Sequence, residues 1–378
     1  MSAILRSNLP LPVVCILLLL VGAGSAGCLG LVQPAAVPPV IVPVDGATFD
    51  GETAYSFPFE QQNISIRVAV DPAVYAGAKQ ADKAIYLYED FTKDEWLPLY
   101  YRAFVNDTHQ RSFYADLLGE LRAVRDREGL DDDRYLELLT AFVQTIPYRT
   151  DDRLIEPKFP IETFADGYGD CDDKSLLLAG ILAREGYGTA LLYFAEEQHM
   201  AVGVKASGCN FSGTGYAYLE VTNGSYIGLP PQELADGTEI VSEPLVIPVG
   251  AAGREYGRCG EIGAIQDALL ASHARFTALG GTIATHATAL QEMERQLASL
   301  RTEIDRLRAA GDISTHNARV SAYNGLVNEY NALCGEYTRM VEDSQVYADI
   351  HNYIVTHTHD RPGTYRFVQE HRSVLEGV

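Results

Sequence analysis

Apolar residues recur every seven positions along the last third of the chain, twice in each heptad. In the first stretch they are Phe276, Ile283, Leu290, Leu297 and Ile304 at one position, with Leu279, His286, Met293, Leu300 and Leu307 at the other. A second stretch follows Gly311-Asp312, with Ile313, Val320, Val327, Cys334 and Val341 at one position and Tyr323, Tyr330 and Tyr337 at the other. Two heptad runs joined by a short glycine-containing turn predict an antiparallel coiled-coil hairpin over residues 261–345. A helical layer packed flat on the rest of the protein is the alternative, and the sequence leaves it open.

Apolar residues also recur at helical spacing through most of residues 72–146. One apolar series ends at Glu128-Gly129, a pair that predicts a helix stop. Asp131, Asp132 and Asp133 then predict the start of another helix, because carboxylates favour the positive end of the helix dipole. Pro147 marks its end.

The pattern changes after residue 167. A turn over Gly167–Ser175 leads into the apolar run Leu176–Leu182, which predicts a helix beginning at Cys171. Four extended segments follow, and they are Thr189–Phe194, Met200–Lys205, Tyr216–Thr222 and Ile240–Val249. One helix followed by an antiparallel sheet predicts an α+β domain, which we assign to residues 63–255 together with its N-terminal helical part.

The remaining stretches flank these two parts. Residues 31–62 contain a proline-rich run that predicts a linker, and residues 346–378 are expected to pack back on the core. Residues 1–30 are typical of an export signal, with Arg6 before the continuous apolar run Val13–Val21. Ser25-Ala26-Gly27-Cys28 resembles a lipobox, so a lipidated Cys28, ordinary cleavage and an uncleaved membrane anchor all stay open. Each alternative places the domains outside the cytoplasm, at the cell surface or secreted.

Charge and motif content exclude several classes of function. The 378-residue chain has a formal net charge of −22 at pH 7, which disfavours nucleic acid partners. No phosphate-binding glycine loop or nucleotide fingerprint occurs, so no cofactor is expected. His351, His357, His359 and Asp360 match no closed zinc pattern, and no metal site is expected either.

Six cysteines raise the question of disulfides. In an oxidising exterior Cys209 and Cys259 could pair, but connectivity cannot be deduced from spacing.

Cys171 is the candidate nucleophile. A thiol at a helix N-terminus lies beside unpaired backbone N–H groups and the helix dipole, which stabilise the thiolate. His199 starts a predicted strand and is the candidate base. If the two central strands pair around a turn near Cys209, Glu220 lies directly or nearly directly across from His199 and could orient it. Asp170, Asp172 and Asp173 work against this reactivity, because their negative charges oppose ionisation of the thiol.

These residues resemble the transglutaminase-like superfamily of papain-type cysteine enzymes. The resemblance rests on Gly169–Ser175, Gln198–Val204 and Tyr218–Thr222, with further similarity to exported microbial members over Val143–Tyr148 and Phe159–Thr163. It covers roughly residues 110–230. It implies a papain-like core with Cys171 as nucleophile, His199 as base and Glu220 in the position where the family usually has Asp. Met200 replaces the family's aromatic residue, and by analogy Gln144 and Tyr148 would help to form an oxyanion pocket.

Members of this superfamily include protein cross-linkers, proteases and amidases of glycans, and some are inactive. We therefore expect an exported, membrane-tethered cysteine enzyme that acts on amide bonds of a protein or peptide at the cell surface through a Cys171 thioester. The alternative is an inactive surface protein that binds a protein partner through the helical hairpin. Fold resemblance alone does not identify the substrate.

Overall fold

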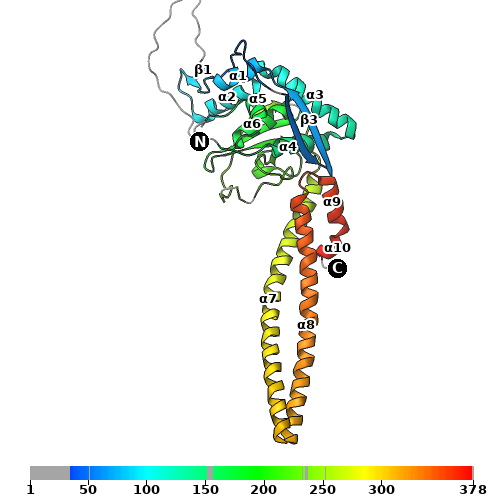
Figure 1. Ribbon diagram of the computed structural model, residues 1–378. Helices are drawn as coiled ribbons and strands as arrows, with labels where there is room; N and C mark the ends of the chain where they lie inside the picture. The colour runs from blue at the N-terminus through cyan, green and yellow to red at the C-terminus, as the bar shows by residue number, and fades with distance from the viewer. Residues whose placement is uncertain are drawn as a thin grey trace, which may run out of the picture. The chain divides into compact units, whose positions relative to one another are not determined.

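The computed structural model describes residues 35–50, 52–150, 156–231, 233–234, 237–251 and 253–376. The chain divides into two compact units, one up to Cys259 and one from Gly260 onward (Figure 1). The predicted export segment lies outside the described residues. Among the described helices, none is both long enough and apolar enough to cross a membrane.

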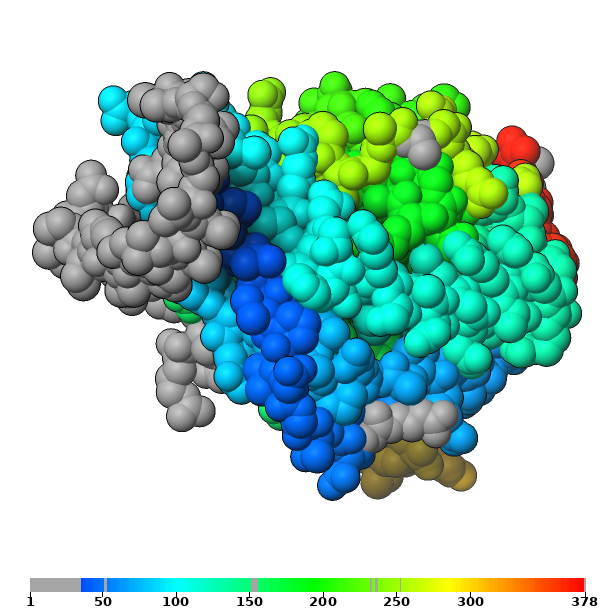
Figure 2. All heavy atoms as spheres, turned by 90° about the horizontal axis from the view of Figure 1, so that it is seen from above, coloured from blue at the N-terminus to red at the C-terminus, as the bar shows by residue number. Residues whose placement is uncertain are grey.

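Helices make up much of the first unit, as the apolar spacing predicts. They are α1 (Pro72–Gln80), α2 (Lys93–Asn106), the short 3-10 helix η1 (Thr108–Gln110), α3 (Arg111–Glu128), α4 (Asp132–Thr145), α5 (Pro160–Asp166) and α6 (Cys171–Arg184). Gly129 ends α3 in the left-handed conformation with φ 60°, and the Asp131 carboxylate accepts the backbone N–H of Arg134 at the start of α4. Figure 2 shows one face of this unit, where cyan helical residues lie between the blue N-terminal residues and the green central residues.

A four-stranded antiparallel sheet follows these helices in the chain. Its strands are β5 (Gly188–Phe194), β6 (His199–Lys205), β7 (Tyr216–Leu219) and β8 (Leu245–Ala251), in the order β7-β6-β5-β8. Helix α6 packs against β5, β6 and β8, and its apolar residues from Leu176 to Leu182 are buried. The first unit is therefore a mixture of helices and antiparallel sheet, as the α+β prediction requires, with α6 in its core.

The predicted linker over residues 31–62 is wrong in its second half. Strand β2 (Glu52–Phe59) pairs with β3 (Gln62–Ala69) in a two-stranded ribbon, and the short β1 (Ala36–Val37) pairs with β4 (Tyr86–Leu87). Phe57 and Phe59 alternate inward along β2 and are buried, whereas Pro58 between them is exposed. A proline on the exposed side of a two-stranded ribbon does not break the strand.

The second unit is built around two long helices. Helix α7 (Cys259–Ala310) and helix α8 (Ile313–Thr356) are joined by a turn in which Gly311 has φ 76°. Contacts between them run in opposite directions along the two helices, with Arg319 Nε 3.1 Å from Glu303 Oε1 and His286 Nε2 3.8 Å from Glu336 Oε2. The hairpin is therefore antiparallel, as the heptads predict (Figure 1).

Most heptad positions lie half-buried along the hairpin, and Leu290 is buried. Phe276, Ile313 and Val341 are instead 45, 73 and 40 % exposed. A straight helix has 3.6 residues per turn, so a stripe of period seven drifts around it, and Ser344 is the buried residue beyond Val341. Tyr323, Tyr330 and Tyr337 are half-buried, and the Tyr330 hydroxyl donates to Glu294 Oε1 at 2.7 Å. These tyrosines therefore belong to the hairpin's own seam.

The C-terminal residues complete the second unit. Helix α8 continues past the predicted boundary at residue 345, and α9 (Arg361–Glu370) and α10 (Arg372–Glu376) follow it. The ring of Phe367 stacks on Tyr353 of α8 at a centroid distance of 3.8 Å, and His357 stacks on the same Tyr353 at 3.9 Å. The Asp360 carboxylate accepts the backbone N–H of Gly363 and caps α9. His357 and Asp360 thus have structural roles within this unit.

Candidate functional site

Cys171 is the first residue of α6, as predicted. The Asp170 carboxylate caps this helix by accepting the backbone N–H of Asp173 at 3.2 Å. Gly169 precedes it because a side chain there would collide with Asp173, whose Cβ would lie only 2.7 Å from an added Cβ. Its backbone N–H donates to the carbonyl of Pro147 at 3.2 Å, which fixes the turn against the end of α4. The Cys171 side chain is held at the head of α6 and is 8 % exposed.

His199 opens β6, where it pairs with Phe194 of β5. The preceding Gln198 has φ 51°, so the chain turns sharply into the strand at this point. Glu197 stabilises the same turn, because its carboxylate accepts the backbone N–H groups of Val241 and Ser242 at 2.9 and 2.8 Å. The imidazole is buried, with 5 % exposed.

Cys171 and His199, the predicted nucleophile and base, both line one cavity of about 380 Å³. Its lining consists of Tyr148, Thr150, Cys171, Glu197, Gln198, His199, Thr222 and Leu234. These residues come from the segment after α4, the head of α6, the turn before β6 and the segments after β7. The nucleophile and the base predicted from sequence thus face one cavity of a size suited to a small part of a substrate.

Glu220 also lies beside His199, but the contact differs from the prediction. The two side chains approach to 3.5 Å between His199 Nε2 and Glu220 Oε2. A third residue, Tyr218, lies between them: its hydroxyl is 3.0 Å from His199 Nε2 and donates to Glu220 Oε2 at 2.8 Å. All three side chains are buried.

The predicted pairing of His199 with Glu220 across the ladder is wrong. Val202 pairs with Leu219 and Gly203 with Tyr218, and β7 ends at Leu219, so Glu220 follows the ladder instead of belonging to it. The register is shifted because the connection between the strands is irregular, with the 3-10 helix η2 (Phe211–Gly213) and Ser212 at φ 42°. Glu220 therefore reaches His199 diagonally.

The Glu220 carboxylate is held by several donors. Its Oε1 accepts the backbone N–H groups of Val221 and Thr222 at 3.0 and 2.8 Å and the Thr222 hydroxyl at 2.6 Å. Burial alone would raise the pKa of Glu220, but the nearby His199 imidazole and the hydrogen bonds from Thr222 outweigh burial and lower it to about 2. Glu220 is therefore a buried anion beside the imidazole.

The surroundings of the Cys171 thiol shift its pKa in the opposite direction. Burial and the nearby charges of Asp172 and Asp170 raise its pKa well above its ordinary value, against a smaller effect of a backbone hydrogen bond from Met200. The thiol is therefore neutral at physiological pH, and the effect of the helix N-terminus does not overcome these carboxylates. The opposition between the helix N-terminus and the neighbouring aspartates, expected from the sequence, is present in the structure.

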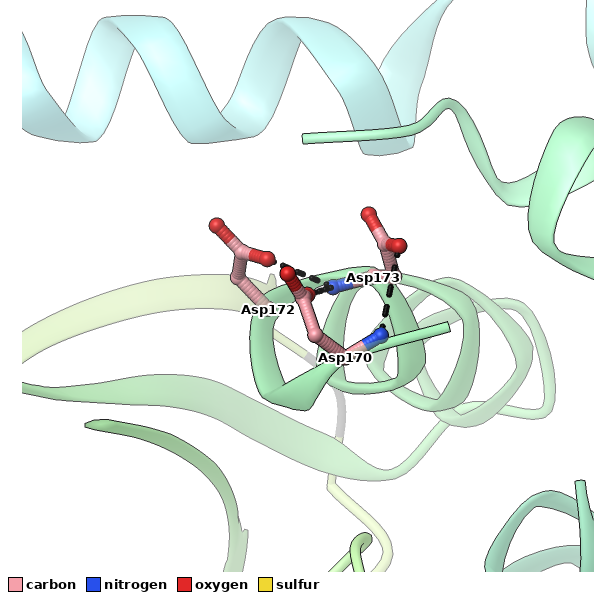
Figure 3. A group of neighbouring side chains, drawn as sticks. All are labelled: Asp170, Asp172 and Asp173. Atoms are coloured by element: carbon pink, nitrogen blue, oxygen red, sulfur yellow. Dashed lines mark hydrogen bonds between the residues drawn. The ribbon is translucent and has the colours of Figure 1, made fainter. Parts of the chain in front are cut away.

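The three aspartates lie around the first turn of α6, as Figure 3 shows. Asp170 and Asp172 accept the backbone N–H of Asp173, and Asp173 accepts the backbone N–H groups of Asp170 and Lys158 at 3.3 and 2.6 Å. Their carboxylate oxygens lie within 4.8 Å of one another, a spacing at which carboxylates can bind a cation. The hydrogen bonds suffice to explain the cluster as a helix cap, and we assign no metal to it.

The predicted oxyanion role of Gln144 is wrong. Its Nε2 donates to the carbonyls of Glu220 and Ser225 at 2.8 and 3.0 Å, so this amide group is used to hold the segment after β7 against α4. Tyr148 does line the cavity and is 46 % exposed.

The Lys174 side chain is fully buried on α6, three residues after Cys171. Its Nζ donates to the carbonyls of Ile146 and Gln144 at 2.6 and 3.2 Å, which ties the C-terminal end of α4 to the first turn of α6. Burial lowers the pKa of Lys174 to about 8, and Glu220 partly offsets this shift.

Sequence reasoning missed Tyr218, Lys174 and Ser175, whose hydroxyl donates to the carbonyl of Met200 at 3.1 Å and joins α6 to β6. One signal was available for Tyr218. Residues two apart on a strand point to the same side, so a tyrosine two positions before the candidate acid is expected on its face.

Comparisons with known proteins do not identify a family for this chain. No protein-family model matches the chain, and neither the curated proteins nor the solved structures give a match.

Proposed function

We propose that this protein is a cysteine enzyme of transglutaminase-like fold that cleaves or transfers the acyl group of an amide through a Cys171 thioester. The observation that carries the proposal is the shared cavity of Cys171 and His199, with the anionic Glu220 behind the imidazole. Nucleophile, base and orienting acid in this order are the arrangement that such catalysis needs. A helix packed on an antiparallel sheet, with the cysteine at the helix start, fits the papain-like core that the motifs suggest.

The first half of the reaction forms the thioester. His199 takes the proton of the Cys171 thiol as the sulfur attacks the substrate carbonyl carbon, and Glu220 stabilises the imidazolium that results. A backbone N–H group at the start of α6 would stabilise the developing oxyanion. The C–N bond then breaks, and His199 donates its proton to the departing amine.

The second half releases the acyl group. Water, or an amine acceptor, loses a proton to His199 as it attacks the thioester carbonyl, and the C–S bond then breaks as His199 returns this proton to the sulfur of Cys171. We favour hydrolysis over cross-linking, because water is always available as an acceptor. The substrate we propose is a peptide bond or a side-chain amide of a protein.

We propose that the enzyme works outside the cytoplasm, tethered to the membrane. The apolar run Val13–Val21 supports export, and the disulfide between Cys209 and Cys259 supports an oxidising compartment.

An activated acyl ester tests the proposal. Incubation at neutral pH should add one acyl group at Cys171, visible by intact mass and removed by hydroxylamine, which cleaves thioesters. Cys171→Ala should acquire no such adduct, and Cys334→Ala is the matched control, since Cys334 is the other free cysteine among the described residues. An adduct of equal amount in Cys171→Ala would overturn the proposal.

A non-catalytic binding protein is the second candidate, and the raised pKa of the Cys171 thiol is the observation that favours it. Absence of any acyl adduct from both free cysteines, in a protein that still captures a partner, would support this candidate instead.

A further inference from the structure

Tyr218 occupies the position between the candidate base and the candidate acid. Its hydroxyl is 3.0 Å from His199 Nε2 and 2.8 Å from Glu220 Oε2, whereas the direct distance between those two atoms is 3.5 Å. The direct approach exceeds an ordinary N–H···O hydrogen bond, and both contacts of the hydroxyl lie within the ordinary range. His199 and Glu220 are therefore connected by two hydrogen bonds through the Tyr218 hydroxyl, and not by a direct one.

We infer that Tyr218 is a positioning residue whose hydroxyl relays the orienting effect of Glu220 to His199, and this inference rests on the proposed function. The hydroxyl donates its hydrogen bond to Glu220, so its oxygen is left to accept a hydrogen bond from the N–H of His199 Nε2. A neutral imidazole with its proton on Nε2 has its lone pair on Nδ1. The relay thus selects Nδ1 as the nitrogen that takes the proton of the thiol.

The surroundings of Tyr218 suit this role. Its ring is fully buried and packs on Phe211 and Phe194 at centroid distances of 5.3 and 6.3 Å, which fixes the position of the hydroxyl. Burial and Glu220 raise its pKa, so the hydroxyl keeps its proton and remains able to donate. The relay also explains how Glu220 could orient His199 although Glu220 lies outside the β6–β7 ladder. Tyr218 is the second-last residue of β7, and its hydroxyl lies between the two side chains.

A double-mutant cycle between Tyr218→Phe and Glu220→Gln tests the relay. The rate of Cys171 alkylation by iodoacetamide at neutral pH should fall about tenfold in Tyr218→Phe, which corresponds to the loss of one buried hydrogen bond. If Glu220 acts through Tyr218, adding Glu220→Gln to Tyr218→Phe should lower the rate little further. Two effects that multiply in the double variant would overturn the inference. Tyr216→Phe, on the same strand, is the matched control and should leave the rate unchanged.

A second readout does not depend on catalysis. In nitrogen-15 NMR spectra of the full chain, the neutral His199 ring should carry its proton on Nε2, and this proton should exchange slowly with water. Tyr218→Phe should speed that exchange or shift the ring toward the other tautomer, while Tyr216→Phe should not. A wild-type ring protonated on Nδ1, or an unchanged spectrum in Tyr218→Phe, would contradict the relay even if Cys171 proves to be the nucleophile. An unreactive Cys171 with the expected spectra would contradict the proposed function alone.

Discussion

Two opposing influences act on the Cys171 side chain. The first turn of α6 offers backbone N–H groups that favour a thiolate, whereas burial and the carboxylates of Asp172 and Asp170 favour the neutral thiol and raise its pKa. The second influence prevails. In the proposed function the thiol would therefore depend on His199 for its reactivity, and general-base removal of its proton fits the site better than a preformed thiolate–imidazolium pair.

Asp172 should destabilise the protein at neutral pH. Burial, together with a hydrogen bond and charge from Asp170, raises the pKa of Asp172 well above its ordinary value. The unfolded chain loses this proton near pH 4, about the ordinary Asp value, while the folded protein loses it only at higher pH. The folded state therefore loses stability as pH rises from there through the folded pKa.

We expect Asp172→Asn to raise the melting temperature at neutral pH, because Asn removes a carboxyl whose ionisation is disfavoured in the folded state. The gain should shrink toward zero as pH falls to about 2.5, well below the ordinary Asp pKa, where the carboxyl is neutral in both states. Thermal unfolding followed by circular dichroism at the two pH values measures this. Asp116→Asn, at an exposed position of α3, is the control. A gain that does not depend on pH would contradict this interpretation.

At the scale of elements, the site depends on how α4 meets α6. The buried Lys174 ammonium bonds two carbonyls at the end of α4, and Gln144 from the same end holds the segment that carries Glu220. Helix α4 therefore links the element that carries the candidate nucleophile to the segment that carries the candidate acid.

Replacing Lys174 with Met should lower the free energy of unfolding by about 1–3 kcal/mol, because two buried carbonyls lose their donor. Urea unfolding measures the change. Lys79→Met is the comparison: Lys79 pairs with Asp166 at 3.0 Å but is partly exposed, so its loss should cost less than about 1 kcal/mol. Equal costs for the two substitutions would show that the Lys174 bonds contribute no special stability.

The Cys209–Cys259 disulfide fixes the connection between β6 and β7. It closes a loop with a sequence separation of 50 residues. Constraining a loop of this length in the unfolded chain stabilises the folded state by about 2–4 kcal/mol. We expect Cys209→Ser and Cys259→Ser each to lose this amount in urea unfolding, and the double variant to lose no more than either. Additive losses would mean that the two sulfurs act separately.

Local signals predicted the elements well and the contacts between elements less well. A glycine turn followed by aspartates was enough to place Cys171 on a helix start, because caps depend on neighbouring residues. The register of His199 against Glu220 depends on the irregular loop around η2, which the sequence does not define. Strand β2 was missed because the linker predicted from the proline-rich run was extended to residue 62, and the alternation of buried Phe57 and Phe59 with exposed Pro58 becomes visible only once the ribbon has formed.

At the scale of the whole molecule, the described chain consists of an α+β unit with the candidate site and a helical unit without it. The heptads predicted the two long helices because a repeat over many turns is an unambiguous pattern. They predicted the ends less well, since the stripe drifts around each helix and leaves Phe276, Ile313 and Val341 exposed.

Removing most of the hairpin should leave the chemistry intact. We expect a variant with residues 276–341 replaced by a short glycine-rich turn to be alkylated at Cys171 at the wild-type rate, because every lining residue of the cavity belongs to the first unit. Any partner bound through the helices would be lost in the same variant. A large fall in the alkylation rate, in a variant whose first unit remains folded by circular dichroism, would assign the hairpin a role in the site.

The central claim is that His199 activates Cys171, and the rate of Cys171 alkylation with and without His199 tests it most directly. Iodoacetamide labelling followed by intact mass should give rapid modification of the wild type at neutral pH and none at this position in Cys171→Ala. His199→Gln should react at least about tenfold more slowly, since each tenfold corresponds to about 1.4 kcal/mol of barrier. Its rate should recover only at high pH, because the pKa of the thiol is raised. Equal rates for the wild type and His199→Gln at neutral pH would contradict the account.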